Sequence, residues 1–187
     1  EYQYVRNMLH LNNGADRGIR FSEIGQLSGI HQTEWSWSPL FADFDNDGNK
    51  DLIVTNGFPK DITDKDFANY RAGVGNVASL GLLEDSIPVV KIPNYAFRNS
   101  GNLAFSDATK QLGMDRPSFS NGASFGDLDN DGDLDYLINN INDEAFVYEN
   151  TLYTSSQKSG TVKNNFLRIR LKGGADKKNH IGSKITL

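Results

Sequence analysis

Two acidic nine-residue segments, 84 positions apart, constrain this chain more than any other feature. They have the sequences DFDNDGNKD, from Asp43 to Asp51, and DLDNDGDLD, from Asp127 to Asp135. Each carries aspartate at its first, third, fifth and ninth positions and glycine at its sixth. Carboxylates this close together repel one another strongly unless a cation lies between them. Because such hard oxygen donors suit Ca²⁺, we predict one Ca²⁺ site in each segment.

The sequence around the acidic segments repeats with the same offset. Short runs rich in β-branched and aromatic residues, bounded by Gly and Asn, flank both segments, at residues 36–43, 52–56, 120–127 and 136–140. Such runs predict strands. Further matching pieces lie at 8–14 and 95–101, at 21–23 and 105–107, and a third copy begins at 145–150. The repeated unit is therefore strand, acidic loop, strand, connection, strand, hairpin, strand.

Four short strands per repeated unit are typical of a β-propeller blade. We predict an all-β fold, a partial β-propeller of about two blades plus fragments, with a short helical insertion. The predicted parts are the end of a preceding blade (1–35), a blade with an insertion at 57–93 (36–119), a partial second blade (120–151), a linker (152–163) and the start of a further β domain (164–187). A propeller needs four to eight blades, so we expect the chain to be a segment of a larger protein.

The insertion at 57–93 and the C-terminal part depart from the strand pattern. Thr63–Asp66 predicts a capping box that opens a short helix, and a second helical run is expected around 78–84, ended by Pro88. Insertions of this length are more often functional than idle, so docking of a partner subunit is one hypothesis for it. Residues 165–173 alternate apolar and polar side chains and predict a strand, and a further strand is expected to begin at 181.

Composition excludes several classes of partner and chemistry. The formal net charge is −5 and no basic stripe is present, so we expect no nucleic-acid partner. No apolar run approaches the roughly 20 residues that a membrane span needs. Cysteine is absent, which excludes disulfides, thiolate metal sites and a cysteine nucleophile. The chain also lacks an initiator Met and a signal-peptide pattern, so we expect a mature or excised piece.

The acidic segments and their flanks carry a resemblance to a known family. FADFDNDGNKDLIV from Phe41 and FGDLDNDGDLDYLI from Phe125 resemble FG-GAP/VCBS repeats, whose blades recur in integrin α-subunit propellers. Residues 165–187 resemble the start of an ASPIC/UnbV domain. The segments 61–64 and 91–99 resemble a bacterial, Bacteroidetes-like subgroup. The resemblance covers nearly the whole chain and implies a fold more than a chemistry.

The resemblance also implies one Ca²⁺ in each acidic segment. The implied side-chain ligands are Asp43, Asp45, Asp47 and Asp51 for one ion, and Asp127, Asp129, Asp131 and Asp135 for the other. The backbone carbonyls of Asn49 and Asp133 would complete the two cages. An EF-hand would instead need glutamate at position twelve and flanking helices, but those positions are Val54 and Ile138, within predicted strands.

Other motifs give weaker signals. Trp35 and Trp37 lie two residues apart, so a strand would place both on one face. Packing between blades is the default interpretation for them, and an aromatic platform for a sugar ring is the functional alternative. Ser124 lies in a G-x-S-x-G pattern, but that motif requires a strand, turn and helix, whereas here a strand leads into the acidic loop. We therefore expect no catalytic residue and no enzyme activity in this chain.

These features together predict a function. Modules of this type outside cells bind Ca²⁺ with dissociation constants of about 10⁻⁴–10⁻³ M, which favours an extracellular or bacterial cell-surface, outer membrane-associated location. We expect adhesion, or recognition of a protein or glycan, with self-association through exposed blade edges as a further expectation. The alternative is a non-catalytic or scaffold part of a polysaccharide-degrading enzyme.

Overall fold

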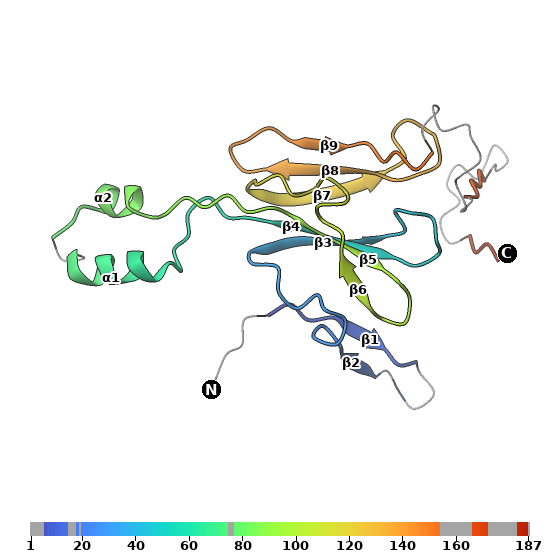
Figure 1. Ribbon diagram of the computed structural model, residues 1–187, viewed down its shortest axis with the longest axis horizontal. Helices are drawn as coiled ribbons and strands as arrows, with labels where there is room; N and C mark the ends of the chain where they lie inside the picture. The colour runs from blue at the N-terminus through green and yellow to red at the C-terminus, as the bar shows by residue number, and fades with distance from the viewer. Residues whose placement is uncertain are drawn as a thin grey trace.

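The structure, a computed structural model, describes residues 6–14, 18, 20–74, 77–153, 166–171 and 183–186. Within these residues nine strands form three small antiparallel sheets, and two short helices form a separate extension. Figure 1 shows the three sheets side by side, in the order of the chain. The predicted all-β fold with a helical insertion is therefore confirmed, and the sheets are consistent with partial propeller blades.

Each sheet is built from strands that follow one another along the chain. The first sheet pairs β1 (His10–Asn12) with β2 (Phe21–Glu23). The second has the order β3 (Ser36–Ala42), β4 (Asp51–Asn56), β5 (Tyr95–Asn99) and β6 (Phe105–Asp107). The third has the order β7 (Ser120–Gly126), β8 (Asp135–Asn140) and β9 (Phe146–Tyr148). Assignment of residues 36–119 and 120–151 to two repeats stays a prediction.

The second and third sheets share their irregularities as well as their strand order. The β3–β4 pairing runs from Ala42 opposite Asp51 and shifts register between Ser36 and Pro39. The β7–β8 pairing starts at the equivalent place and shifts register between Ser120 and Gly122. A proline within a strand is tolerated at such a shift, because it has no N–H to offer the ladder. The same irregularity at the same place shows that the two sheets are copies of one backbone plan.

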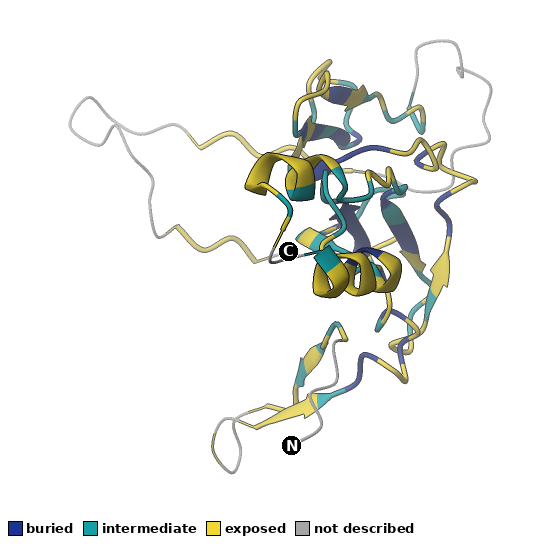
Figure 2. Ribbon diagram, turned by 90° about the vertical axis from the view of Figure 1, so that its left-hand side faces the viewer, coloured by how far each residue is buried: buried dark blue, intermediate teal, exposed yellow. Residues whose placement is uncertain are grey.

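Strand β4 lies at the centre of the core, and all six of its residues are buried. Successive side chains of a strand point to opposite faces of the sheet. Ile53 accordingly packs in one cluster with Tyr136 and Ile138 of the third sheet. Leu52 and Val54 pack in a second cluster with Ile30 and partly buried Leu9, near the first sheet. Figure 2 shows the buried residues concentrated in the sheets.

The insertion forms a helical extension at the end of the sheets opposite the acidic loops (Figure 1). It contains α1 (Lys65–Val74) and α2 (Leu80–Asp85), close to the predicted helices. The predicted cap at Thr63 is wrong, because Asp64 accepts the hydrogen bond from the Phe67 N–H at 2.7 Å. The Thr63 hydroxyl instead donates to Asp61 Oδ1. Among the described residues, no helix is long and apolar enough to span a bilayer.

The described residues test the C-terminal predictions only in part. Residues 166–171 lie in no strand, so the strand predicted over 165–173 is wrong for that stretch. Alternation shows that a segment suits a sheet, but a strand forms only where a partner edge accepts its hydrogen bonds. The predicted linker beyond residue 153, and the beginning of the strand predicted from 181, lie outside the described residues.

Candidate metal centres

Each acidic segment forms the loop between the first two strands of its sheet, β3–β4 and β7–β8. Both loops turn through the left-handed region at the same two positions. Asn46 and Asn130 have φ of 53° and 66°, which asparagine tolerates better than most residues. Gly48 and Gly132 follow with φ of 91° and 105°, where a Cβ would be strained. Asn and Gly at these positions therefore fold each loop so that its carboxylates turn inward.

Three carboxylates converge in each loop. Oxygens of Asp43, Asp45 and Asp47 lie within 4.8 Å of one another, and so do oxygens of Asp127, Asp129 and Asp131. Two unit charges at this separation repel by about 1 kcal/mol in water and by about 4 kcal/mol at a protein surface. Three such pairs per loop are a large cost for a domain whose net stability is about 5–15 kcal/mol. The predicted grouping of the first, third and fifth aspartates is thus found in both loops.

Backbone N–H groups hold the triad carboxylates in place. In the first loop the Asp47 N–H donates to Asp43 Oδ1 at 3.0 Å, and the Gly48 N–H donates to Asp43 Oδ2 at 3.0 Å. In the second loop the Asp131 N–H donates to Asp129 Oδ1 at 3.1 Å. These bonds fix the orientation of the carboxylates before any cation binds.

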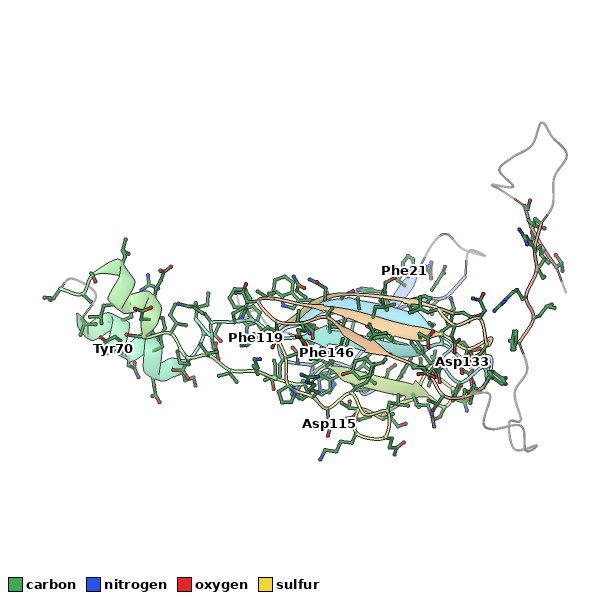
Figure 3. All side chains as sticks on the ribbon, turned by 90° about the horizontal axis from the view of Figure 1, so that it is seen from above. Phe21, Tyr70, Asp115, Phe119, Asp133 and Phe146 are labelled. Atoms are coloured by element: carbon green, nitrogen blue, oxygen red, sulfur yellow. The ribbon has the colours of Figure 1, made fainter. Side chains whose placement is uncertain are left out.

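The second loop offers oxygen atoms for which the described residues give no hydrogen-bond partner. These buried atoms are Asp127 Oδ1, Asp131 Oδ2 and Asp133 Oδ1. Asp133 is only 1% exposed, and burial, together with the neighbouring Asp131 carboxylate, raises its pKa to about 6. Figure 3 places Asp133 at the end of the sheets away from the helical extension. Buried, unpaired carboxylate oxygens are a donor set that fits a hard divalent cation.

The ninth-position aspartates lie outside the two triads and bind backbone. Asp51 Oδ1 accepts the Asn99 N–H at 2.8 Å, and Asp135 Oδ1 accepts the Asn150 N–H at 2.9 Å. Asp135 Oδ2 also accepts the Leu128 N–H at 2.8 Å. Burial raises the pKa of Asp51 to about 6. Their predicted role as ligands, like that of the Asn49 and Asp133 carbonyls, stays a prediction.

Two asparagines that the sequence analysis did not identify complete the loops. Asn99 is the last residue of β5 and Asn150 lies two residues after β9, and both bind the acidic loop of their sheet through backbone and side chain. Their side-chain Nδ2 groups donate to the carbonyls of Lys50, at 3.0 Å, and Leu134, at 3.3 Å. Both asparagines stand at matching places in the aligned pieces 95–101 and 145–150. That match was the available signal, but an asparagine after a strand is also an ordinary turn residue.

One arginine lies against a triad carboxylate in each loop. The Arg98 Nε lies 3.3 Å from Asp45 Oδ2, and Arg168 forms an ion pair with Asp127. The pKa of Asp45 is nonetheless raised, because burial and the Asp47 charge outweigh the Arg98 charge. A single guanidinium on one carboxylate therefore balances only part of the charge in each loop.

The two tryptophans lie at the other end of the second sheet and pack on the first residues of the helical extension. Trp35 and Trp37 both stack on Phe58, with ring centroids 5.3 and 6.2 Å away. The Trp37 Nε1–H donates to the Gly57 carbonyl at 2.7 Å, and 46% of the residue is exposed. Phe58, just beyond β4, supplies the ring contact that the described residues give for both tryptophans. Packing between blades and the sugar platform both stay predictions.

A comparison with protein families identifies a repeat in the part of the chain that contains the first acidic loop. Residues 3–54 match the family model described as an FG-GAP-like repeat. The match spans β1 to β4 and includes the whole first acidic loop, whereas the second loop lies beyond it. No curated protein matches the chain. The ASPIC/UnbV and bacterial-subgroup resemblances stay predictions.

Proposed function

We propose that this chain is a Ca²⁺-stabilised β-propeller segment of a secreted or cell-surface protein, which recognises a protein or glycan and has no catalytic role. The observation that carries the proposal is the pair of aspartate triads at the same end of adjacent sheets. A Ca²⁺ in each triad would be held by its three carboxylates and would neutralise their mutual repulsion. It would thereby join the first two strands of each sheet at the loop.

The proposed location follows from the strength expected of such sites. Oxygen-only loops in extracellular modules bind Ca²⁺ with dissociation constants of about 10⁻⁴–10⁻³ M. Such sites fill where free Ca²⁺ is in the millimolar range and stay empty where it is submicromolar. An extracellular or bacterial surface setting, associated with the outer membrane, is the one in which both loops are loaded.

The proposed recognition surface is the aromatic cluster of Trp35, Trp37 and Phe58. The Trp37 ring is half exposed, and its Nε1–H bond to Gly57 fixes the ring orientation. A fixed, exposed indole face suits stacking against the apolar face of a sugar ring or a partner side chain, because little rotamer freedom is lost on binding. The same surface supports the second candidate, a non-catalytic part of a polysaccharide-degrading enzyme.

Self-association through sheet edges is the proposed route to oligomers. Strand β9 is an edge of the third sheet, and its Val147 is 65% exposed. An unpaired edge with an apolar side chain is a template for pairing with another chain. Light scattering should detect species larger than a monomer; a clean monomer at high concentration would count against this part.

The cation proposal is tested by thermal unfolding with Ca²⁺ and with EGTA. Two sites filled to about 100 times their dissociation constants stabilise a fold by about 5 kcal/mol. For a chain of this size that corresponds to a rise in melting temperature of roughly 10–20 °C. A melting curve that is the same in EGTA and in Ca²⁺ would overturn the proposal.

The recognition proposal is tested by a glycan and protein binding screen of the chain with Ca²⁺. Trp37→Ala should abolish binding of any ligand found, whereas exposed Phe21→Ala, in the first sheet, should leave it unchanged. Turnover of a polysaccharide panel by the full-length protein would favour the enzyme alternative. Binding that survives Trp37→Ala would remove the aromatic cluster from the proposal.

A further inference from the structure

We propose that the two acidic loops bind cations as one coupled pair, and that the Asn150 side chain transmits the coupling. This inference rests on the proposed function, because it requires both loops to hold a cation. Binding at the first loop raises the affinity of the second, and the reverse follows by thermodynamic reciprocity.

Asn150 is the only one of the two loop-binding asparagines for which the described residues give a bond to the neighbouring sheet. Asn99 and Asn150 make the same bonds inside their own sheets, to the ninth-position aspartate and the eighth-position carbonyl. The Asn150 Nδ2 also donates to the carbonyl of Phe44, in the first loop, at 2.7 Å. A single amide group therefore contacts the backbone of both acidic loops.

Two further contacts join the loops. The Asn46 Nδ2 donates to the Gly132 carbonyl at 3.3 Å, from the fourth position of the first loop to the sixth of the second. The Phe44 ring makes edge contacts with Phe125 and Tyr136, at centroid distances of 6.0 and 5.8 Å. Those two residues lie on β7 and β8, the strands that carry the second loop. The position of Phe44 thus depends on both sheets at once.

Buried carboxylate oxygens in the second loop are a separate observation that points to a bound cation. The Asp133 side chain is almost fully buried beside Asp131, and no described residue forms a hydrogen bond with its Oδ1. The same holds, in the described part of the chain, for buried Asp127 Oδ1 and Asp131 Oδ2. A cation can contact all three oxygens at once only when the loop is ordered, so anything that orders the loop strengthens cation binding there.

The sign of the coupling follows from the ordering cost. A cation in the first loop fixes the backbone around Phe44, and the Asn150 bond extends that order to Leu134 and Asp135. A second cation then meets a loop whose ordering is already complete, which gives positive coupling. Electrostatic repulsion between the ions opposes this only weakly. The loops hold nine aspartates, so two divalent ions leave the pair net negative.

The test measures the affinity of the second loop with the first loop intact and disabled, by calorimetric titration of Ca²⁺ into the full chain. Asp43→Asn with Asp47→Asn disables the first loop. In the otherwise natural chain this should weaken Ca²⁺ binding at the second loop at least about five-fold. In an Asn150→Ala chain the same change should have a much smaller effect on the second loop, because only the Asn46 and Phe44 contacts still join the loops. Asn99→Ala is the matched control, and it should retain the five-fold loss.

A second variant guards against a folding defect in Asn150→Ala. Asn46→Gly keeps the positive φ at that position but removes the bond to Gly132, and it should reduce the loss without abolishing it. Two independent sites in the natural chain, or a loss in Asn150→Ala as large as in the natural chain, would overturn the coupling alone. A natural chain that binds no Ca²⁺ would overturn the proposed function itself.

Discussion

The two acidic loops have the same aspartate spacing and the same backbone turn but different charged surroundings. The first loop has Asn49 at its seventh position and Arg98 against its third-position carboxylate. The second has a buried aspartate, Asp133, at the seventh position and Arg168 against its first-position carboxylate. The repeat therefore preserves the scaffold that collects the carboxylates, while the charges that balance them differ from copy to copy.

This difference predicts unequal cation affinity. The second loop has one more carboxylate, and three of its carboxylate oxygens are buried with no hydrogen bond to any residue that the structure describes. Buried charges are screened less than exposed ones, so a cation there gains more electrostatic energy. We expect the second loop to bind Ca²⁺ more tightly than the first.

The largest expected effect tests what the loops share. Asp51→Ala and Asp135→Ala each remove the acceptor of two backbone N–H groups. Hydrogen bonds to a charged group contribute about 1.5–3 kcal/mol each, so the loss of two costs about 3–6 kcal/mol in total. Urea unfolding in saturating Ca²⁺ should show a similar loss of stability for both variants, and exposed Asp115→Ala should show none. A large loss in one loop only would mean that the two scaffolds are not equivalent.

The next effect compares the triads. Asp47→Asn and Asp131→Asn should each abolish one cation site, which costs about 2.7 kcal/mol at 100 times the dissociation constant. The melting temperature in Ca²⁺ should fall by roughly 5–10 °C. In EGTA the same variants should melt higher than the natural chain, because one repelling charge is gone. A shift of the same sign under both conditions would contradict the role assigned to the triads.

A smaller effect is the pH dependence of the cation-free protein. Burial raises the pKa of Asp51 and of Asp133 to about 6, so the folded chain binds these protons more tightly than the unfolded chain, where an aspartate titrates near 4. In buffer freed of Ca²⁺ beforehand, the free energy of unfolding should therefore fall as pH rises from about 4 to about 6. Asp133→Asn should flatten this dependence, and Asp115→Asn should not. Urea unfolding across this pH range measures the slope, and a rise in stability over the window would contradict the prediction.

The smallest effect concerns the arginines. Exposed ion pairs contribute about 0.2–1 kcal/mol, so Arg168→Gln should raise the Ca²⁺ affinity of the second loop by up to about five-fold. Arg98→Gln should do the same for the first loop only. Arg170→Gln, two residues along the same segment, serves as the control in a calorimetric titration. Weaker binding in Arg168→Gln would show that this arginine assists the cation rather than competing with it.

The sequence predicted the strands, both acidic loops and the helical insertion, because each has a local signal. Alternation and the Asp and Gly spacing are visible within a few residues. The cap at Thr63 was wrong, because Asp64 one residue later accepts the Phe67 N–H, and the alternation over 166–171 forms no strand. The roles of Asn99 and Asn150 were not predictable, since they depend on loops 48 and 15 positions away in the chain. The contact between Phe58 and the tryptophans was missed for a similar reason, because the chain must turn at Gly57 to bring them together.

The two ends of the helical extension, where it joins the second sheet, have a practical consequence for protein engineering. Phe58 and Val90 already face each other across an antiparallel bridge, and the Asp61 N–H donates to the Pro88 carbonyl at 2.9 Å. The chain thus leaves and re-enters the second sheet at neighbouring points, on the side away from both acidic loops (Figure 1). The extension could therefore be replaced by a short turn or by a fluorescent domain, because the two ends of the chain to be joined already lie next to each other. Such a replacement would not alter the cation loops.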